Sequence, residues 1–328
     1  MACEDDDTLG ATHVIDPSGE VIIILQNANA PFAVWRASIQ SSAAKKEDDT
    51  NEGIRIRVSA KHLILASPVF ERALTGPWKE SISLDQEGST EITAENWDIE
   101  ALLIFLRIIH CQFQFVPQEM SLELLAKFAV VADYYGCQAA VGFFSRIWVQ
   151  DRIIPKTYSR DLILWLWVTW FFNLPDQFRD ATSIAMSQCN GEIYPLGLPI
   201  PCAIIEQMNA VRKSSIQSLY CLLDGRRASL LHGERGCHFE CRAMLYGTVS
   251  MHMHDNQLFW PGILGQSYEK SARSTETVRR PRWREPCADN SNTANNRRLH
   301  SCPDCNFNRL LGDVEQSVKG LKLQSFTA

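Results

Sequence analysis

The segment IRVSAKHLILASPVFERALTGPWKES, residues 56–81, changes its hydrophobic rhythm twice. Its first residues continue an alternation that begins at Ile54, in which arginines separate the apolar side chains. This period of two predicts a strand with one solvated face. The spacing then becomes helical, with a short first helix that closes at Leu65. Pro68 favours a second helix, because proline is tolerated in a first helical turn, and Gly76-Pro77 ends it.

Two further strand regions are predicted on either side of this segment. Gly19 to Leu25 is a short β-branched run between turn-forming residues, which is typical of a buried strand. In residues 81–93, Ile82 and Leu84 alternate with polar residues, and a turn is predicted at Gln86 to Thr90. The amino-terminal part of the chain is therefore expected to contain a small β-sheet.

Helical spacing is strongest in the region that follows. Trp97 to His110 and Leu122 to Tyr135 both carry apolar residues at the i, i+3, i+4, i+7 positions of an amphipathic helix. Ser121 is a suitable N-cap for the second helix, and Gly136 stands where a left-handed C-terminal cap is expected. A further helix is predicted at Gln138 to Val149.

After Pro155 the sequence is typical of helices at Asp161 to Asn173, Pro175 to Cys189 and Pro201 to Leu231. The most apolar stretch, Leu162 to Leu174, is shorter than the roughly 20 residues that a membrane-spanning helix needs. We therefore expect it to be a buried helix and expect no contact with a membrane.

The segment 56–81 resembles the signature of the BTB/POZ domain, in which a strand leads into a short helix, Ser-Pro-x-Phe follows, and the next helix ends in Thr-Gly. The predicted strands and paired helices also follow the order of that family. The resemblance implies an α+β fold with a small β-sheet flanked by α-helices, covering residues 16–150 with a flexible insertion at 38–53. A fold alone does not assign an activity.

A wider resemblance extends along most of the chain. The stretches VIIILQNANAPFAVW, AVVADYYGC, LGLPIP and GCHFEC are similar to those of a group of filamentous-fungal BTB domain-containing proteins, whose biochemical role is undefined. The composition of the remaining segments predicts an acidic disordered tail at 1–15, an all-helical domain at 155–270, a disordered Arg/Asn/Ser-rich linker at 271–300 and a C-terminal docking segment at 301–328.

One surface motif follows from the resemblance. The candidate partner-binding residues are Trp78, Lys79, Glu80 and Phe70. The first three lie eight to ten residues after Phe70, where cullin-binding members of the family carry an apolar residue, any residue and an acid. An apolar anchor beside a carboxylate suits a groove on a partner helix. In the alternative interpretation, Trp78 only covers the domain edge and Glu80 is solvated. Ser59-Ala60 replaces the family's usual His-Lys/Arg pair, which argues against a repressor-recruiting pocket.

The resemblance implies a non-enzymatic protein–protein interaction module that forms a homodimer and recruits partners. The first hypothesis is a substrate adaptor of a cullin-type ubiquitin ligase, with an unknown client. The alternative is a dimeric scaffold or transcription-associated interaction protein without cullin binding. The sequence lacks the phosphate-binding, nucleophile-elbow and His-Glu-x-x-His motifs of common enzyme classes, so no enzymatic activity is expected.

The carboxyl-terminal part contains a group of soft metal ligands. Cys237 and Cys241 are four residues apart, and His300, Cys302 and Cys305 follow about sixty residues later. Four such side chains suit a tetrahedral zinc site that would pin the end of the chain across the linker. In the alternative interpretation, these cysteines are small buried core residues. No cofactor is required by the sequence, and zinc is the one that it allows.

Charge and cysteine content limit the environment and the partners. The 328 residues include 32 basic and 38 acidic side chains, so the net charge of -6 provides no global field for nucleic acid or an anionic membrane. The acidic start of the chain is unlike a signal peptide. We expect an intracellular protein of the nucleus or cytoplasm, not a secreted one, with reduced cysteines and no direct nucleic-acid binding.

Overall fold

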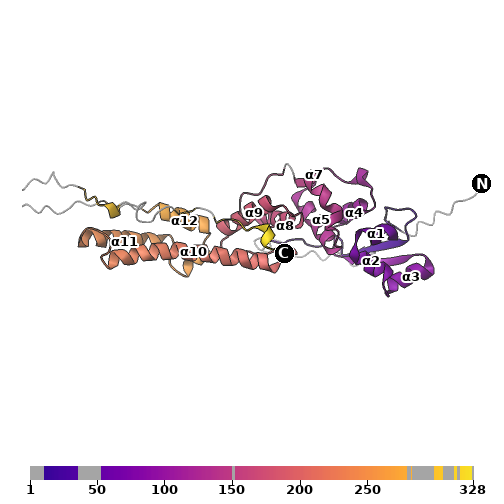
Figure 1. The fold of residues 1–328 in the computed structure, drawn as a ribbon, viewed down its shortest axis with the longest axis horizontal. Helices are drawn as coiled ribbons and strands as arrows, with labels where there is room; N and C mark the ends of the chain where they lie inside the picture. Colours follow the sequence, from indigo (N-terminus) through magenta and orange to yellow (C-terminus); the bar gives the residue numbers. More distant parts are fainter. Residues whose placement is uncertain are drawn as a thin grey trace, which may run out of the picture. The chain divides into compact units, whose positions relative to one another are not determined.

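The computed structural model divides the chain into two compact units (Figure 1). Unit 1 comprises residues 1–155, 159–178 and 195–200, and unit 2 comprises residues 156–158, 179–194 and 201–328. The structure describes residues 11–35, 53–149, 152–278, 282, 299–305, 314–315 and 318–326. The fold is a mixture of α and β structure, as predicted, with a small sheet and many helices.

Unit 1 contains a four-stranded sheet in the order β1-β3-β2-β4. The bounds of its strands are β1 (His13–Val14), β2 (Val21–Gln26), β3 (Ile54–Val58) and β4 (Thr90–Glu95). β2 pairs antiparallel with β3 and parallel with β4, so β2 lies inside the sheet. Ile23 and Ile56 are register partners and are fully buried. The strands predicted at 19–25 and 54–58 are confirmed.

Two short helices follow β3, as predicted: α1 (Ala60–Ala66) and α2 (Pro68–Thr75). Ser67 fixes the break between them, because its hydroxyl accepts hydrogen bonds from the backbone N–H groups of Val69 and Phe70, both at 3.2 Å. The same hydroxyl donates to the Tyr135 carbonyl at 2.6 Å. Pro68 occupies the first helical turn, where its missing N–H costs nothing.

The prediction of a strand near Ile82 and Leu84 is wrong, because these residues lie in α3 (Lys79–Glu87). The alternation covered only two apolar positions, which a helix also accommodates. Gly88 ends the helix in the left-handed conformation, with φ at 73°, and its N–H donates to the Leu84 carbonyl. The later half of the predicted strand region is confirmed as β4.

The two helices with the strongest periodicity are confirmed as α4 (Ile99–Ile109) and α5 (Leu122–Tyr134). The Ser121 hydroxyl accepts from the Leu124 N–H at 3.1 Å, so the predicted N-cap is present. Gly136 has a φ of 68°, as expected for the left-handed cap. The single helix predicted at 138–149 is instead divided into α6 (Gln138–Val141), η3 (Gly142–Phe144) and α7 (Ser145–Val149). Glycine at 142 favours this break.

The tryptophan-rich helix α8 (Arg160–Phe171) belongs to unit 1 and packs against α5. Nine of its twelve residues are buried, and the Trp167 indole N–H donates to the Ala126 carbonyl at 3.2 Å. Arg160 donates to the carbonyl of Ala33 at 2.9 Å and pairs with Glu123 at 2.8 Å. The expected boundary at 155 therefore differs from the division between the compact units.

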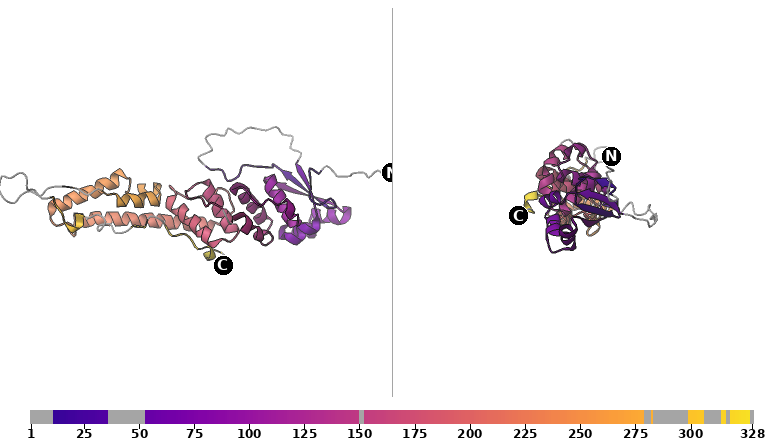
Figure 2. Two further views of the ribbon diagram at one scale, coloured as in Figure 1. Left: turned by 90° about the horizontal axis from the view of Figure 1, so that it is seen from above. Right: turned by 90° about the vertical axis from the view of Figure 1, so that its right-hand side faces the viewer.

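Most of unit 2 is helical. Its long helices α10 (Cys202–Leu231) and α11 (Phe239–Asp255) lie side by side and are joined by a short loop (Figures 1 and 2). The neighbouring elements are α9 (Pro175–Gln188), η4 (Gly262–Gly265) and α12 (Tyr268–Glu276). The predicted disordered linker began at 271, whereas residues 271–276 belong to α12. The rest of that linker lies mostly outside the described residues, as do 1–10 and 36–52.

The end of the chain packs along α9 within unit 2. The Val318 N–H donates to the Ser187 hydroxyl at 2.8 Å, and the Ser183 hydroxyl donates to the Val318 carbonyl at 2.6 Å. Leu323 follows in η6 (Leu323–Ser325) and is buried. This part of the segment at 301–328 is thus held by hydrogen bonds between its backbone and serine side chains of α9, and by two buried apolar side chains, Val318 and Leu323. Among the described residues, no helix has the length and apolar character to cross a membrane.

Candidate metal centre and candidate partner surface

Four of the five predicted metal ligands lie together in unit 2. Cys237 precedes the first turn of α11, and Cys241 lies within it, so their spacing places both thiols at one end of the helix. His300 and Cys302 lie on the segment 299–305. One ligand atom from each of the four residues lies within 4.8 Å of the others. The side chain of Cys305 is outside the described residues.

Two of the distances in this Cys3His cluster fit a tetrahedral ion. The Cys241 and Cys302 sulfurs are 3.6 Å apart, and the Cys237 sulfur is 3.4 Å from His300 Nε2. Zinc bonds of about 2.3 Å to sulfur and about 2.0 Å to nitrogen give tetrahedral edges of about 3.8 Å and 3.5 Å. Both separations therefore match the edges of a zinc tetrahedron to within a few tenths of an ångström.

Residues around the cluster hold its two segments together. Asp304 accepts from the Gly236 N–H at 2.7 Å and pairs with Arg235 at 3.2 Å, which ties the 299–305 segment to the loop before α11. His238 Nδ1 lies 2.9 Å from the Cys237 sulfur. Gly236 has a φ of 85°, where a side chain would be strained, and the Arg242 side chain occupies the space beside it.

The burial of the cluster is graded. Cys241 is fully buried, Cys302 is half-buried, and Cys237 is exposed. Burial raises the pKa of the Cys241 thiol above its ordinary value, since a thiolate is poorly solvated there. A divalent cation among the sulfurs would have the opposite effect and would favour thiolates. The donor set of three sulfurs and one imidazole is typical of structural zinc sites.

The motif at Trp78 to Glu80 lies at the start of α3. The Trp78 side chain is 58% exposed, and Trp78 and Glu80 line the same hollow of about 630 Å³ together with Val69, Ala73 and Ile92. Lys79 is the first residue of the helix. The exposed indole and the carboxylate therefore lie on one surface, as an anchor and an orienting charge would require.

Phe70 does not contribute to that surface. It is 1% exposed and stacks on Tyr135 with ring centroids 4.4 Å apart. Phe105 also stacks on Tyr135, with ring centroids 5.4 Å apart. The structure thus places Phe70 in the core of unit 1, where it stabilises α2, and leaves Trp78, Lys79 and Glu80 as the residues near the surface.

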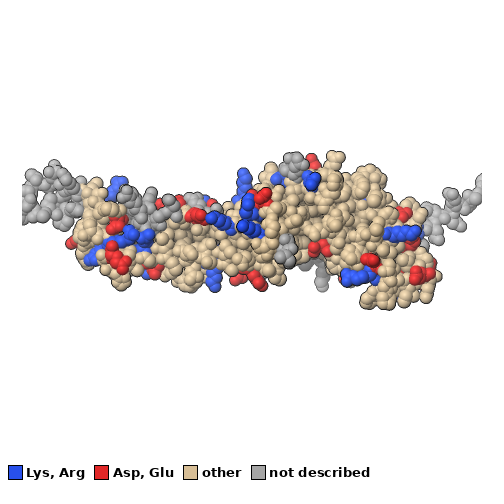
Figure 3. Space-filling view, viewed as in Figure 1, with Lys and Arg blue, Asp and Glu red and all other residues tan. Residues whose placement is uncertain are grey.

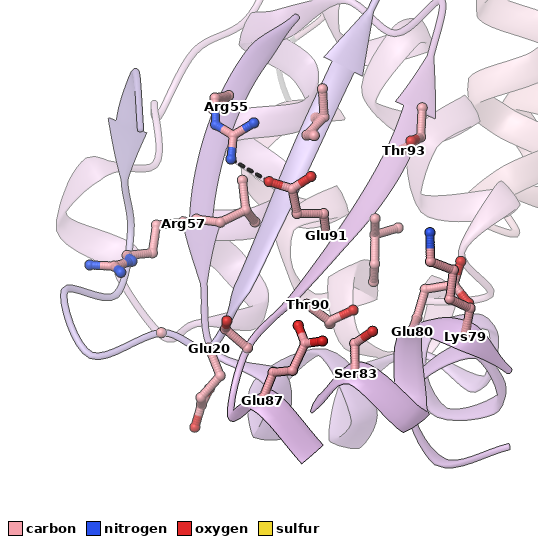
Figure 4. A pocket seen from close by; sticks show the side chains of 15 residues that line it. Glu20, Arg55, Arg57, Lys79, Glu80, Ser83, Glu87, Thr90, Glu91 and Thr93 are labelled. Carbon is pink, nitrogen blue, oxygen red and sulfur yellow. Dashed lines mark hydrogen bonds and ion pairs between the residues drawn. The ribbon is translucent and has the colours of Figure 1, made fainter. Parts of the chain in front are cut away.

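A second hollow, of about 670 Å³, opens between α3 and one face of the sheet (Figure 4). Arg55 and Glu91 form an ion pair across its floor, and Ser83 and Glu87 face it from α3. At its edge, the Glu20 carboxylate accepts from the Ala60 N–H at 3.1 Å and so caps α1. Arg55 and Glu91 therefore compensate each other's charge within the hollow.

The Ser59-Ala60 position is filled by contacts within unit 1. The Ser59 N–H donates to His110 Nε2 at 3.0 Å, and His110 Nδ1 donates to the Leu106 carbonyl at 2.7 Å. His62 stacks on this ring at a centroid distance of 4.9 Å. Ser59 and His110 are both buried, and burial lowers the pKa of His110. Sequence analysis missed His110 because it is one residue in an otherwise apolar helix face.

Unit 1 also has an apolar groove of about 770 Å³ between α1, α4 and α7, which was not predicted from the sequence. Leu65 and Phe143, which line it, are 88% and 72% exposed. The signal was present in the Phe113-Gln-Phe115 and Phe143-Phe144 pairs, which are unusual in a solvated connection.

Basic and acidic side chains are interspersed on the described residues of the face shown in Figure 3. This distribution matches the small negative net charge and offers no extended basic stripe on that face. Comparison of the chain with family models, curated proteins and solved structures finds no match. The function is therefore inferred from the Cys3His cluster and from the surface around Trp78.

Proposed function

We propose that the Cys3His cluster of Cys237, Cys241, His300 and Cys302 binds one structural zinc ion. The observation that carries this proposal is the convergence of four soft ligand atoms within 4.8 Å from segments about sixty residues apart in sequence. Four protein ligands complete a tetrahedron and leave no position for a substrate. The role of the ion is to fasten the 299–305 segment to the end of α11.

The experiment measures zinc in the purified full-length chain by mass spectrometry of the metal. We expect one zinc ion per chain, and loss of this ion in Cys241→Ser and Cys302→Ser. Cys221→Ser is the matched control, because Cys221 is an exposed cysteine of α10 outside the cluster. Zinc-free wild type, or a zinc content that the cluster substitutions leave unchanged, would exclude the proposal.

For unit 1, we propose a protein-interaction function as a BTB-like module. Its support is the sequence resemblance at 56–81 together with the exposed Trp78 indole beside Glu80. In this proposal the module forms a homodimer and binds a cullin scaffold through Trp78 and Glu80, and the remainder of the chain recruits an unknown client. No enzymatic step is assigned to any residue.

The alternative for unit 1 is a dimeric scaffold or transcription-associated interaction protein without cullin binding. The closed Ser59–His110 contact favours the absence of a repressor-binding pocket at that position. The exposed Leu65 and Phe143 side chains favour an association surface elsewhere on the unit. Both hypotheses place the protein in the nucleus or cytoplasm.

Affinity purification from the organism's own cells distinguishes the two. We expect cullin to be recovered with the wild type and lost with Trp78→Ala/Glu80→Ala. Tyr134→Ala is the matched control, because this aromatic side chain of α5 is 60% exposed, close to the 58% of Trp78, and it lines neither the Trp78 hollow nor the apolar groove. Cullin recovery that does not depend on Trp78 would exclude this contact, and its absence from every sample would favour the scaffold. Light scattering of the purified chain tests the dimer.

A further inference from the structure

Two cysteines of the Cys3His cluster are close enough to react with each other. The Cys241 and Cys302 sulfurs are 3.6 Å apart and belong to residues separated by 61 positions in the sequence. A disulfide needs a sulfur–sulfur distance of about 2.0 Å, so an approach of less than 2 Å joins them. The Cys237 sulfur also lies near both of these sulfurs, and in addition it contacts His238 Nδ1 at 2.9 Å and His300 Nε2 at 3.4 Å.

The accessibility of the two thiols suits a stepwise oxidation. Cys302 is half-buried and can meet a small solvent oxidant, whereas Cys241 is fully buried. A buried thiol that cannot meet the oxidant itself is suited to resolve the oxidised form of its neighbour. The cluster is also reachable from solvent through the exposed Cys237.

We propose that a hydroperoxide oxidises this pair, which joins Cys241 to Cys302 and expels the metal; this inference rests on the proposed zinc binding. The Cys302 thiolate attacks one oxygen of hydrogen peroxide and breaks the O–O bond, so that the sulfur becomes a sulfenic acid and the other oxygen leaves as hydroxide. The Cys241 thiolate then attacks the Cys302 sulfur, forms the S–S bond and releases hydroxide. Two thiolates lose two electrons, and the peroxide takes these electrons and two protons from solvent to form two water molecules.

The reaction replaces the zinc-mediated link between α11 and the 299–305 segment with a disulfide. Zinc keeps only Cys237 and His300 after the disulfide forms, and two protein ligands do not retain it in competition with chelators. The disulfide still links α11 to the 299–305 segment, because Cys241 and Cys302 come from these two segments. Asp304 continues to hold the segment through Arg235 and Gly236. The oxidised protein therefore loses its metal without releasing the segment.

The test uses the zinc-loaded, full-length protein and hydrogen peroxide. Zinc content is measured first, release is then followed with a colour-forming zinc chelator, and disulfides are mapped by mass spectrometry without reduction. We expect one equivalent of zinc to leave as the Cys241–Cys302 disulfide forms, and a thiol reductant with added zinc to restore the starting state. Cys221→Ser is expected to behave as the wild type.

A second variant separates the disulfide from metal binding. Cys237→Ser lowers zinc affinity but retains both reacting sulfurs, so peroxide is expected to form the same disulfide in it. A disulfide through Cys237, over-oxidation of Cys302 without a disulfide, or zinc that remains bound after oxidation would overturn the inference while zinc binding itself stands. Absence of zinc before oxidation would overturn the proposed metal site and, with it, the expulsion step.

Discussion

Helices α8 and α10 are stabilised in different ways. Nine of the twelve residues of α8 are buried, on all sides of the helix. In α10 only seven of thirty are buried, and they form one stripe along its length. A helix buried all round is held by shape and apolar area, whereas one with a narrow stripe needs further connections. Unit 2 provides them as polar and cysteine contacts.

Two such connections in unit 2 are specific. Arg212, on the buried stripe of α10, donates to the carbonyls of Cys189, Leu264 and Gln266 at 2.7–3.1 Å. Asp304 and the Cys3His cluster hold the 299–305 segment at the opposite end of the α10–α11 pair. The stability of α8 therefore depends mainly on apolar packing in the core of unit 1, whereas α10 in unit 2 also depends on a few directional hydrogen bonds.

The largest effect is expected for Trp167→Ala in α8. The indole is 1% exposed, and its removal leaves a large cavity and an unpaired Ala126 carbonyl lone pair, which costs about 3–5 kcal/mol of unfolding free energy. Urea unfolding followed by far-ultraviolet circular dichroism measures it. Trp78→Ala is the control, since that indole is largely exposed and its loss should cost less than about 1 kcal/mol. Equal costs would contradict the assignment of α8 to the core.

A smaller effect is expected for Arg212→Met in α10. Methionine keeps the apolar stem but leaves three carbonyl groups, two of them in buried contacts, without this donor, at a cost of about 2–4 kcal/mol. Lys213→Met is the matched control, because Lys213 is exposed on the same helix and its loss should change stability by no more than about 0.5 kcal/mol. The same denaturation experiment applies. If Arg212→Met were neutral, the dependence of unit 2 on directional contacts would be wrong.

Asp304→Ala should have a local effect of about 1 kcal/mol, since both of its contacts are partly exposed. We expect faster hydrogen exchange at residues 299–305 and zinc affinity weakened by about fivefold, with little change in global unfolding. Asp255→Ala removes an exposed carboxylate from the far end of α11 and serves as the control. Unchanged exchange at 299–305 would show that Asp304 does not hold the segment.

The smallest effect is a pH dependence of unit 1 that comes from His110. Burial lowers its pKa below the ordinary value of 6.5, so the folded state binds this proton less readily than the unfolded state. The stabilising contribution is complete above about pH 6.5 and decreases as the pH falls from there toward the lowered pKa. Urea midpoints between pH 5 and 8 should show this slope in the wild type and a shallower one in His110→Gln. Equal slopes would remove His110 as the cause.

Local sequence signals were sufficient where one residue determines the backbone. Pro68 and Gly136 marked helix ends that the structure contains, and Ser121 marked a cap. The signal failed at Ile82 and Leu84, because two alternating apolar residues fit a strand or an exposed helix equally well. Strand pairing decided the outcome, since residues 90–95 pair with β2 as β4, whereas Ile82 and Leu84 lie in α3.

The sequence also did not distinguish the exposed from the buried aromatic residue of the partner motif. Trp78 and Phe70 are both aromatic and only eight positions apart, and the sequence assigned both to partner binding, yet one is largely exposed and the other stacks in the core. Hydrophobicity gives no direction for a side chain near a domain edge. Only packing against Tyr135 separates the two.

The α+β composition, the positions of most helices and the identity of the candidate metal ligands could be predicted from the sequence. The assignment of α8 to unit 1 and the convergence of four of these ligands became visible only in the folded chain; the four are Cys237, Cys241, His300 and Cys302. The physical reason is the range of the interactions. Helix caps and periodicity depend on residues a few positions apart, whereas the position of a ligand sixty residues away depends on how every element between them packs.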